Sequence, residues 1–182
     1  VRTKFPGGVL SAQQYLTCDR LAAQYANNTL RITTRQDFQF HGVVKSGLRQ
    51  TIKGLNDALI TTIAACGDVN RNVMATPTPA TSPLIDEVLQ QARKLSDLLA
   101  PTTPAYHQIW IEGRELDLNG EANANFVDPL YGKRYLPRKF KIGLAIPPLN
   151  DVDVFTHCCG FIAIGDGSGK LSGYNLAVGG GM

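Results

Sequence analysis

The sequence predicts an α+β protein, in which short strands and helices follow one another along the chain. Residues 30–42 alternate apolar and polar side chains, as a half-buried strand does. Residues 48–59 and 83–99 carry apolar side chains at helical spacing. Residues 161–164 and 171–178 are apolar runs joined by Gly-Asp-Gly-Ser-Gly, which is typical of a β-hairpin.

The first part of the chain has the order strand, helix, strand, helix. Val1–Phe5 alternate in polarity and predict a short strand. Ser11-Ala12-Gln13-Gln14 is a capping box, so a helix begins there. The strand over 30–42 and a helix from about Leu48 to Leu59 follow. This order predicts a ferredoxin-like half domain over residues 1–65.

The second predicted domain covers residues 66–182 and mixes sheet with helix. Residues 74–82 are rich in Thr, Pro and Ala, which indicates a linker. Ser82-Pro83 is a good N-cap and first-turn pair for the helix behind it. A strand is expected over 106–111, a polar loop over 112–128, and a further strand after residues 136–142.

Composition excludes several classes of protein. The net charge is +3 and no Lys/Arg run occurs, so a nucleic-acid partner is not expected. No apolar stretch is long enough to span a bilayer, and no signal-peptide pattern is present. The four cysteines form no CxxC pair, which favours buried thiols and a reducing, cytoplasmic setting. The chain opens without Met and ends in Gly-Gly-Gly-Met, so we expect it to be cut at both ends.

Three further motifs are excluded by spacing. Residues 165–170 (GDGSGK) lack the glycine that a phosphate-binding loop needs five positions before its Gly-Lys pair, and they fit a hairpin turn. His41, His107 and His157 have no metal-ligand spacing, so no metal is assigned to protein ligands. No Gly-x-Ser-x-Gly motif indicates a serine hydrolase.

The strand over 30–42 offers the strongest candidate binding surface. Its even positions, from Leu30 to Phe40, predict a core face. Its odd positions are polar and include Arg31, Arg35, Gln39 and His41. Two guanidinium groups beside an amide and an imidazole could hold a flat, anionic ligand. The alternative is an ordinary amphipathic strand with one solvated face.

Other cations sit at predicted strand ends and turns. Arg2 shares one side of the first strand with Lys4, and Lys139 and Lys141 share one side of a later strand, directly after Arg138. Arg71 lies in a turn between two asparagines. Arginine forks match carboxylates and oxyanions, and lysines supply compact charge. Each of these residues alone could equally be a solvated surface charge.

At these residues the chain resembles the siroheme-dependent sulfite and nitrite reductases, and it is most similar to the assimilatory sulfite reductases. The resemblance rests on five stretches in the family's order, and the FQFHG and LPRKFK forms look more like sulfite than nitrite reductases. The stretches are residues 1–8 (VRTKFPGG), 29–42 (TLRITTRQDFQFHG), 67–73 (GDVNRNV), 135–141 (YLPRKFK) and 174–181 (YNLAVGGG).

The resemblance implies six-electron reduction of sulfite to sulfide at a siroheme that is coupled to a [4Fe–4S] cluster. The residues that match the family's substrate-binding cations are Arg2, Arg71, Lys139 and Lys141. Those that match its siroheme-carboxylate partners are Arg31, Arg35, Gln39, His41 and, as a weaker candidate, Arg138. The electron donor implied is either ferredoxin or a flavoprotein subunit that uses NADPH.

The cysteines depart from the family pattern. The family's cluster ligands form CxxxxxC and CxxxC pairs, and this sequence has neither; adjacent Cys158 and Cys159 cannot reach separate irons. We therefore expect a fragment that holds the N-terminal part of the siroheme-binding domain, with the cluster ligands outside it. The alternatives are nitrite reduction to ammonia, or a non-catalytic fragment that binds anions or tetrapyrrole.

Overall fold

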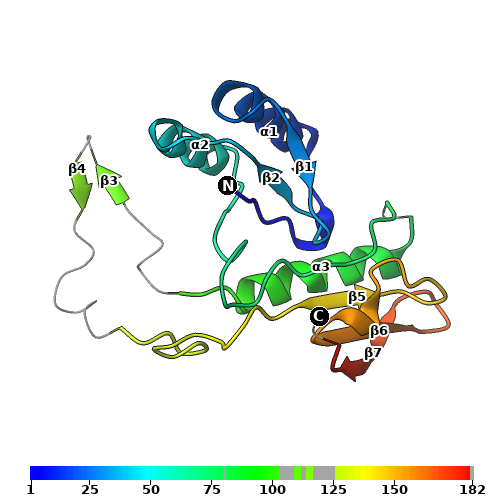
Figure 1. The fold of residues 1–182 in the computed structure, drawn as a ribbon. Coiled ribbons are helices and arrows are strands. Elements are labelled where there is room, and N and C mark those ends of the chain that lie inside the picture. The colour runs from blue at the N-terminus through cyan, green and yellow to red at the C-terminus, as the bar shows by residue number, and fades with distance from the viewer. Residues whose placement is uncertain (80, 103–108, 112–113, 117–125, 181–182) are drawn as a thin grey trace.

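The computed structural model describes residues 1–79, 81–102, 109–111, 114–116 and 126–180. Within these residues the fold is α+β, as predicted, with helices and three small sheets (Figure 1). The strand orders are β1–β2, β3–β4 and β5–β6–β7. No helix in the described part of the chain is long and apolar enough to cross a membrane.

The first half of the chain packs helices α1 (Ala12–Tyr25) and α2 (Lys45–Asp57) beside the hairpin of β1 (Leu30–Ile32) and β2 (Phe38–Phe40) (Figure 1). The predicted capping box starts α1, because Ser11 accepts a hydrogen bond from Gln14 N and the Gln14 side chain accepts one from Ser11 N. Their buried core lies entirely within the first sixty residues, where Phe5, Leu21 and Leu55 are among its members.

The prediction of one continuous strand over 30–42 is wrong. The chain turns back at residues 33–36, and β1 pairs antiparallel with β2 so that Arg31 faces Gln39. The predicted core face is also interrupted, because Phe38 and Phe40 are buried while Ile32 is 73% exposed. Ile32 stands at the end of a three-residue strand, next to the turn at residues 33–36.

Two other elements of the first half differ from expectation. Val1–Phe5 form no regular strand and pair only at single bridges, Arg2 with Gln39 and Lys4 with Thr61. Helix α2 begins at Lys45, three residues before the predicted start at Leu48. Because the three residues before Leu48 carry no apolar side chain, the apolar pattern did not indicate this start. Its buried face contains Thr51 and Leu55, whereas Leu48 is exposed.

The second half contains α3 (Pro83–Leu98), capped by Ser82 as predicted, and a mixed sheet. Strand β5 (Ile142–Ala145) runs parallel to β6 (Cys159–Gly165), which pairs antiparallel with β7 (Leu171–Val178). The predicted hairpin over 161–178 is therefore confirmed. Figure 1 shows α3 lying along this sheet, and Val88 and Ala92 of α3 pack against Ile142 and Leu144 in a second core.

The remaining elements are short. The 3₁₀ turns are η1 (Pro6–Gly8) and η3 (Val154–Thr156). Strand β3 (Ile109–Ile111) matches the end of the strand expected over 106–111, whose first residues lie outside the described range. The loop expected over 112–128 contains β4 (Arg114–Leu116), which pairs with β3; residues 112–113 and 117–125 are not described.

Candidate anion site

One row of polar side chains crosses the β1–β2 hairpin. Arg2 bridges to Gln39 on one side, and Arg31 pairs with Gln39 on the other, so these side chains share a face. The Arg2 guanidinium donates to Gln39 Oε1, through Nε at 3.0 Å and through Nη2. Gln39 Nε2 donates in turn to His41 Nε2 at 2.9 Å. The structure thus brings together Arg2, Arg31, Gln39 and His41.

Arg35 lies apart from this row, at the tip of the hairpin, and points toward the second half of the chain. Its Nη2 donates to the carbonyl oxygens of Asn72 and, at 3.0 Å, Ile142. Its Nε is buried and makes no hydrogen bond to a described residue. Burial lowers the Arg35 pKa to about 10, and the Arg71 charge adds to the effect. Arg35 therefore keeps N–H donors for a ligand at the junction of the two halves.

Two side chains dock the hairpin tip onto residues 72–75. Asn72 Nδ2 donates to the carbonyl oxygens of Phe5 and Arg35, at 2.6 and 2.9 Å. The Gln36 amide pairs with the backbone of Ala75 in both directions, at 2.6 and 3.2 Å. These hydrogen bonds join the two halves of the chain, and they fix the position of Arg35 between them.

His157 is a site residue that spacing in the sequence did not indicate. Arg35 Nη1 lies 3.3 Å from His157 Nδ1, and because arginine can only donate, Nδ1 accepts. The proton then sits on Nε2, which lies 2.9 Å from the Val152 carbonyl oxygen. Burial, and then the charges of Arg35 and Lys141, lower the His157 pKa, which favours this neutral tautomer. The only local signal is Gly143 in a short strand, because the imidazole ring packs where a Cβ would be.

The other predicted cations gather beside Arg35. Residues 69–74 run parallel to residues 140–143, through bridges at Asn70–Phe140 and Met74–Gly143, and this pairing places Arg71 beside Lys141. Arg71 Nε donates to the Gly67 carbonyl oxygen at 2.6 Å. Burial lowers the Lys141 pKa, and the charges of Lys139, Arg35 and Arg138 lower it further.

The Asp37 carboxylate interacts electrostatically with Arg35 and Arg2. It is 3% exposed, and its Oδ1 accepts a hydrogen bond from Phe5 N at 2.9 Å. Burial raises the Asp37 pKa to about 7, against the opposing effects of that hydrogen bond and of the Arg35, Arg2 and Lys4 charges. Asp37 is one of the odd, polar positions of residues 30–42, but it is not among the predicted site residues.

The cluster carries a large excess of positive charge. Arg31 and Lys139 are exposed, and neither makes a hydrogen bond or an ion pair to a described residue. A group of guanidinium and ammonium side chains with an excess of positive charge can hold an oxyanion or a polycarboxylate. We call the two neighbouring groups together the cationic cluster; it comprises Arg2 and Arg31 in the row on the hairpin, and Arg35, Arg71, Arg138, Lys139 and Lys141 at the junction of the two halves.

Three separate parts of the fold carry the four cysteines, and only Cys158 and Cys159 are neighbours. Cys18 is buried among α1 residues, Cys66 is exposed, and Cys158 and Cys159 are half-buried, all as free thiols. Within the described ranges, no group of three His, Cys, Asp or Glu side chains is arranged to hold a metal ion.

Comparison with protein families gives matches over both halves. Residues 1–58 match the nitrite/sulfite reductase ferredoxin-like half domain. Residues 90–182, just over half of the chain, match the nitrite and sulphite reductase 4Fe-4S domain. The chain belongs to the nitrite and sulphite reductase family. The cationic cluster of this family member is formed by residues from both matched regions and from the segment between them.

Individual relatives agree with the family. The chain is 54% identical, over its full length, to the sulfite reductase [NADPH] hemoprotein beta-component of Shouchella clausii, and 52% identical to that of Methylobacterium nodulans. It spans only 31% and 30% of the length of these relatives. The solved structure of the Mycobacterium tuberculosis NirA protein has the same fold, with a TM-score of 0.68 at 23% identity over 100% of this chain and 28% of that one.

Proposed function

We propose that this chain forms part of a siroheme-dependent sulfite reductase, which reduces sulfite to sulfide. The observation that carries the proposal is the cationic cluster at the junction of the two halves. The relatives named as sulfite reductase hemoproteins, at 54% and 52% identity, support sulfite as the substrate. In this proposal Arg2, Arg71, Lys139 and Lys141 hold the anion.

The residues present fit a siroheme. This tetrapyrrole carries eight carboxylates, and buried carboxylates need cationic or N–H partners. The buried, unpartnered Nε of Arg35 and the side chain of Arg31 supply such donors. We assign the carboxylates to Arg31, Arg35, Gln39, His41 and Arg138. When bound, siroheme supplies an iron that ligates the anion and delivers electrons; the chain's own residues orient the anion and balance its charge.

A [4Fe–4S] cluster does not fit on this chain. Cys18 is in the core of the first half, while Cys158 and Cys159 are adjacent in the second, so the thiols cannot surround one cluster. We infer that its ligands belong to the remainder of the longer protein. The relatives are named as NADPH sulfite reductases, which favours a donor that uses NADPH over ferredoxin. The domain division between residues 65 and 66, and a cytoplasmic location, remain predictions.

Assays on the full-length protein test the proposal. The purified protein should release siroheme on extraction and should form sulfide from sulfite with an NADPH-dependent donor. The family models name both reductases, so nitrite is the competing substrate. A protein without siroheme would contradict the proposal, and a higher kcat/KM for nitrite than for sulfite would replace it with nitrite reduction.

A further inference from the structure

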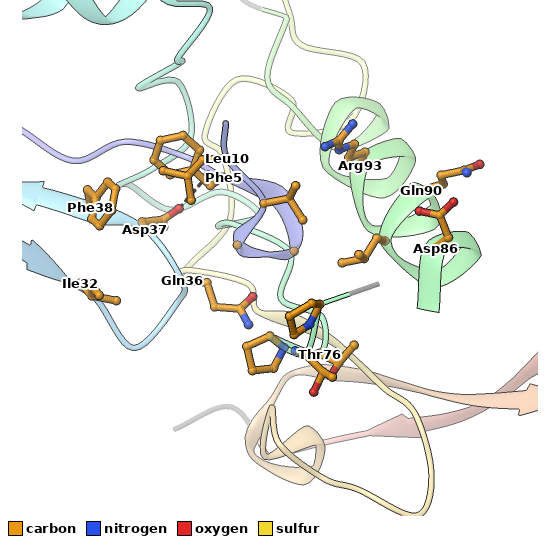
Figure 2. Close-up of a pocket in the computed structure, with 17 residues that line it drawn as sticks. Phe5, Leu10, Ile32, Gln36, Asp37, Phe38, Thr76, Asp86, Gln90 and Arg93 are labelled. Atoms are coloured by element: carbon orange, nitrogen blue, oxygen red, sulfur yellow. Dashed lines mark hydrogen bonds between the residues drawn. The ribbon is translucent and has the colours of Figure 1, made fainter. Parts of the chain in front are cut away.

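A cavity of about 560 Å³ separates the hairpin tip from α3 (Figure 2). Its walls come from the hairpin, from η1, from residues 76–79 and from the face of α3 that carries Asp86 and Arg93. Most of the lining is apolar, with Phe5, Ile32 and Phe38 among the labelled side chains. Asp37 lies in this lining, so water in the cavity can reach the neighbourhood of a buried carboxyl group.

Two members of the cationic cluster lie close to Asp37 along the backbone, since Arg2 bridges to Gln39, two residues after Asp37, and Arg35 precedes Asp37 by two residues in the hairpin turn. Arg35, from the hairpin tip, and Arg2, from the N-terminal segment, both act on its charge, as does the neighbouring Lys4. None of these three approaches within ion-pair distance in the described structure. The coupling is therefore electrostatic through space, and it changes with any charge that binds to Arg2 and Arg35.

We propose that Asp37 couples proton uptake to the binding of an oxyanion at the cationic cluster. An anion held there repels the Asp37 carboxylate and offsets the cations that favour its ionised form. The carboxylate then takes up one proton from the buffer, relayed by water in the cavity, and becomes a neutral carboxylic acid, with no transfer of electrons. This inference rests on the proposed function, and it adds a proton-linked response to that same site.

The physical chemistry near neutral pH fits this role. With a pKa of about 7, Asp37 exists in both protonation states at that pH, so a modest coulombic change alters its charge. The groups that face it are Arg35, Arg2 and Lys4 on the cluster side and Asp86 and Arg93 across the cavity. By linkage, protonated Asp37 strengthens anion binding as much as the bound anion favours protonation.

The test uses the full-length, siroheme-loaded protein, with nitrite as the probe because nitrite keeps one charge between pH 6 and 8. Calorimetric titrations in two buffers of different ionisation enthalpy give the number of protons taken up on binding. We compare the wild type with Asp37→Asn, whose amide oxygen can still accept from Phe5 N, and with Asp86→Asn as the control on the same cavity. The wild-type Kd should rise about three- to tenfold more between pH 6 and 8 than the Asp37→Asn Kd.

Each outcome decides the inference. Proton uptake that is present in the wild type and in Asp86→Asn, and lost in Asp37→Asn, supports it. Equal uptake in all three proteins overturns it and leaves the proposed function standing. Absence of nitrite binding by the wild type contradicts the anion site itself and therefore both proposals. Infrared difference spectra of the wild type give a test without a variant, since nitrite should increase the carboxylic acid C=O band at pH 7.

Discussion

Replacing Gly143 with alanine should disturb the site through a single methyl group. The added Cβ would lie 2.7 Å from His157 Nε2, inside van der Waals contact, and the ring must move. Overpacking of this kind costs about 1–3 kcal/mol. Moving the ring also weakens the hydrogen bonds to Arg35 and Val152, at about 0.5–1.5 kcal/mol each. We expect Gly143→Ala to lower the free energy of unfolding by about 2–6 kcal/mol.

Urea denaturation of Gly143→Ala, His157→Ala and the double variant isolates this contact. If the imidazole ring is the obstacle, the Gly143→Ala change should cost less than about 1 kcal/mol once His157 is alanine. Gly173→Ala in β7 is the matched control, because nothing lies within 4 Å of the added Cβ. An equal cost of Gly143→Ala with and without the ring would refute this reasoning.

Three further predictions follow from the site. Asp37→Asn should become more stable than the wild type as pH rises from about 4 to 7, by at most about 4 kcal/mol. The wild-type carboxyl group ionises near pH 4 in the unfolded state and near pH 7 in the folded state, so the wild type loses stability across this window. Thermal melts at pH 4 and 8 check this, and a pH-independent difference would contradict it. Lys139→Ala or Lys141→Ala should cost about 2–4 kcal/mol of transition-state stabilisation in the full-length enzyme, with little change in melting temperature. The control is Lys53→Ala, and variants that lost stability but kept full turnover would mark structural charges. The 182-residue chain alone should not reduce sulfite with a dye donor; turnover accompanied by iron–sulfur absorbance would disprove this.

Local chemistry explains which elements could be predicted. The N-termini of α1 and α3 are set by side chains that bond within three residues, Ser11 with Gln14 and Ser82 with Ile85. The β6–β7 hairpin has a glycine-rich turn in which Asp166 accepts from the backbone of Ser168 and Lys170. Such signals are complete within a short window of sequence, so no tertiary information was needed.

The β1–β2 turn shows where this reasoning fails. It contains no glycine, and Gln36 adopts a φ of 60°, which non-glycine residues rarely do. Thr33 Oγ1 accepts from the backbone N–H groups of Arg35 and Asp37, and docking onto Asn72 and Ala75 adds bonds from far along the chain. Those distant partners, which the sequence pattern does not display, hold the turn.

The same distinction applies to the site. The sequence pattern predicted a shared polar face for Arg31, Gln39 and His41, but it is the β1–β2 hairpin that brings Arg31 opposite Gln39, which contacts His41. The position of Arg35 and the part played by His157 depend on Arg35 reaching across the junction between the halves, over 122 positions of sequence. The roles assigned to these residues stay predictions, while their proximity is a property of the fold.

The location of the first core bears on how the protein is made. Because that core is built only from residues up to Ile60, it can become complete while the later segments are still being synthesised. Arg71, Lys139 and Lys141 emerge afterwards, so the cationic cluster is assembled by docking a finished unit onto a later one. Arg31, which is exposed in the complete fold, is presented on the first unit before the later cations join it.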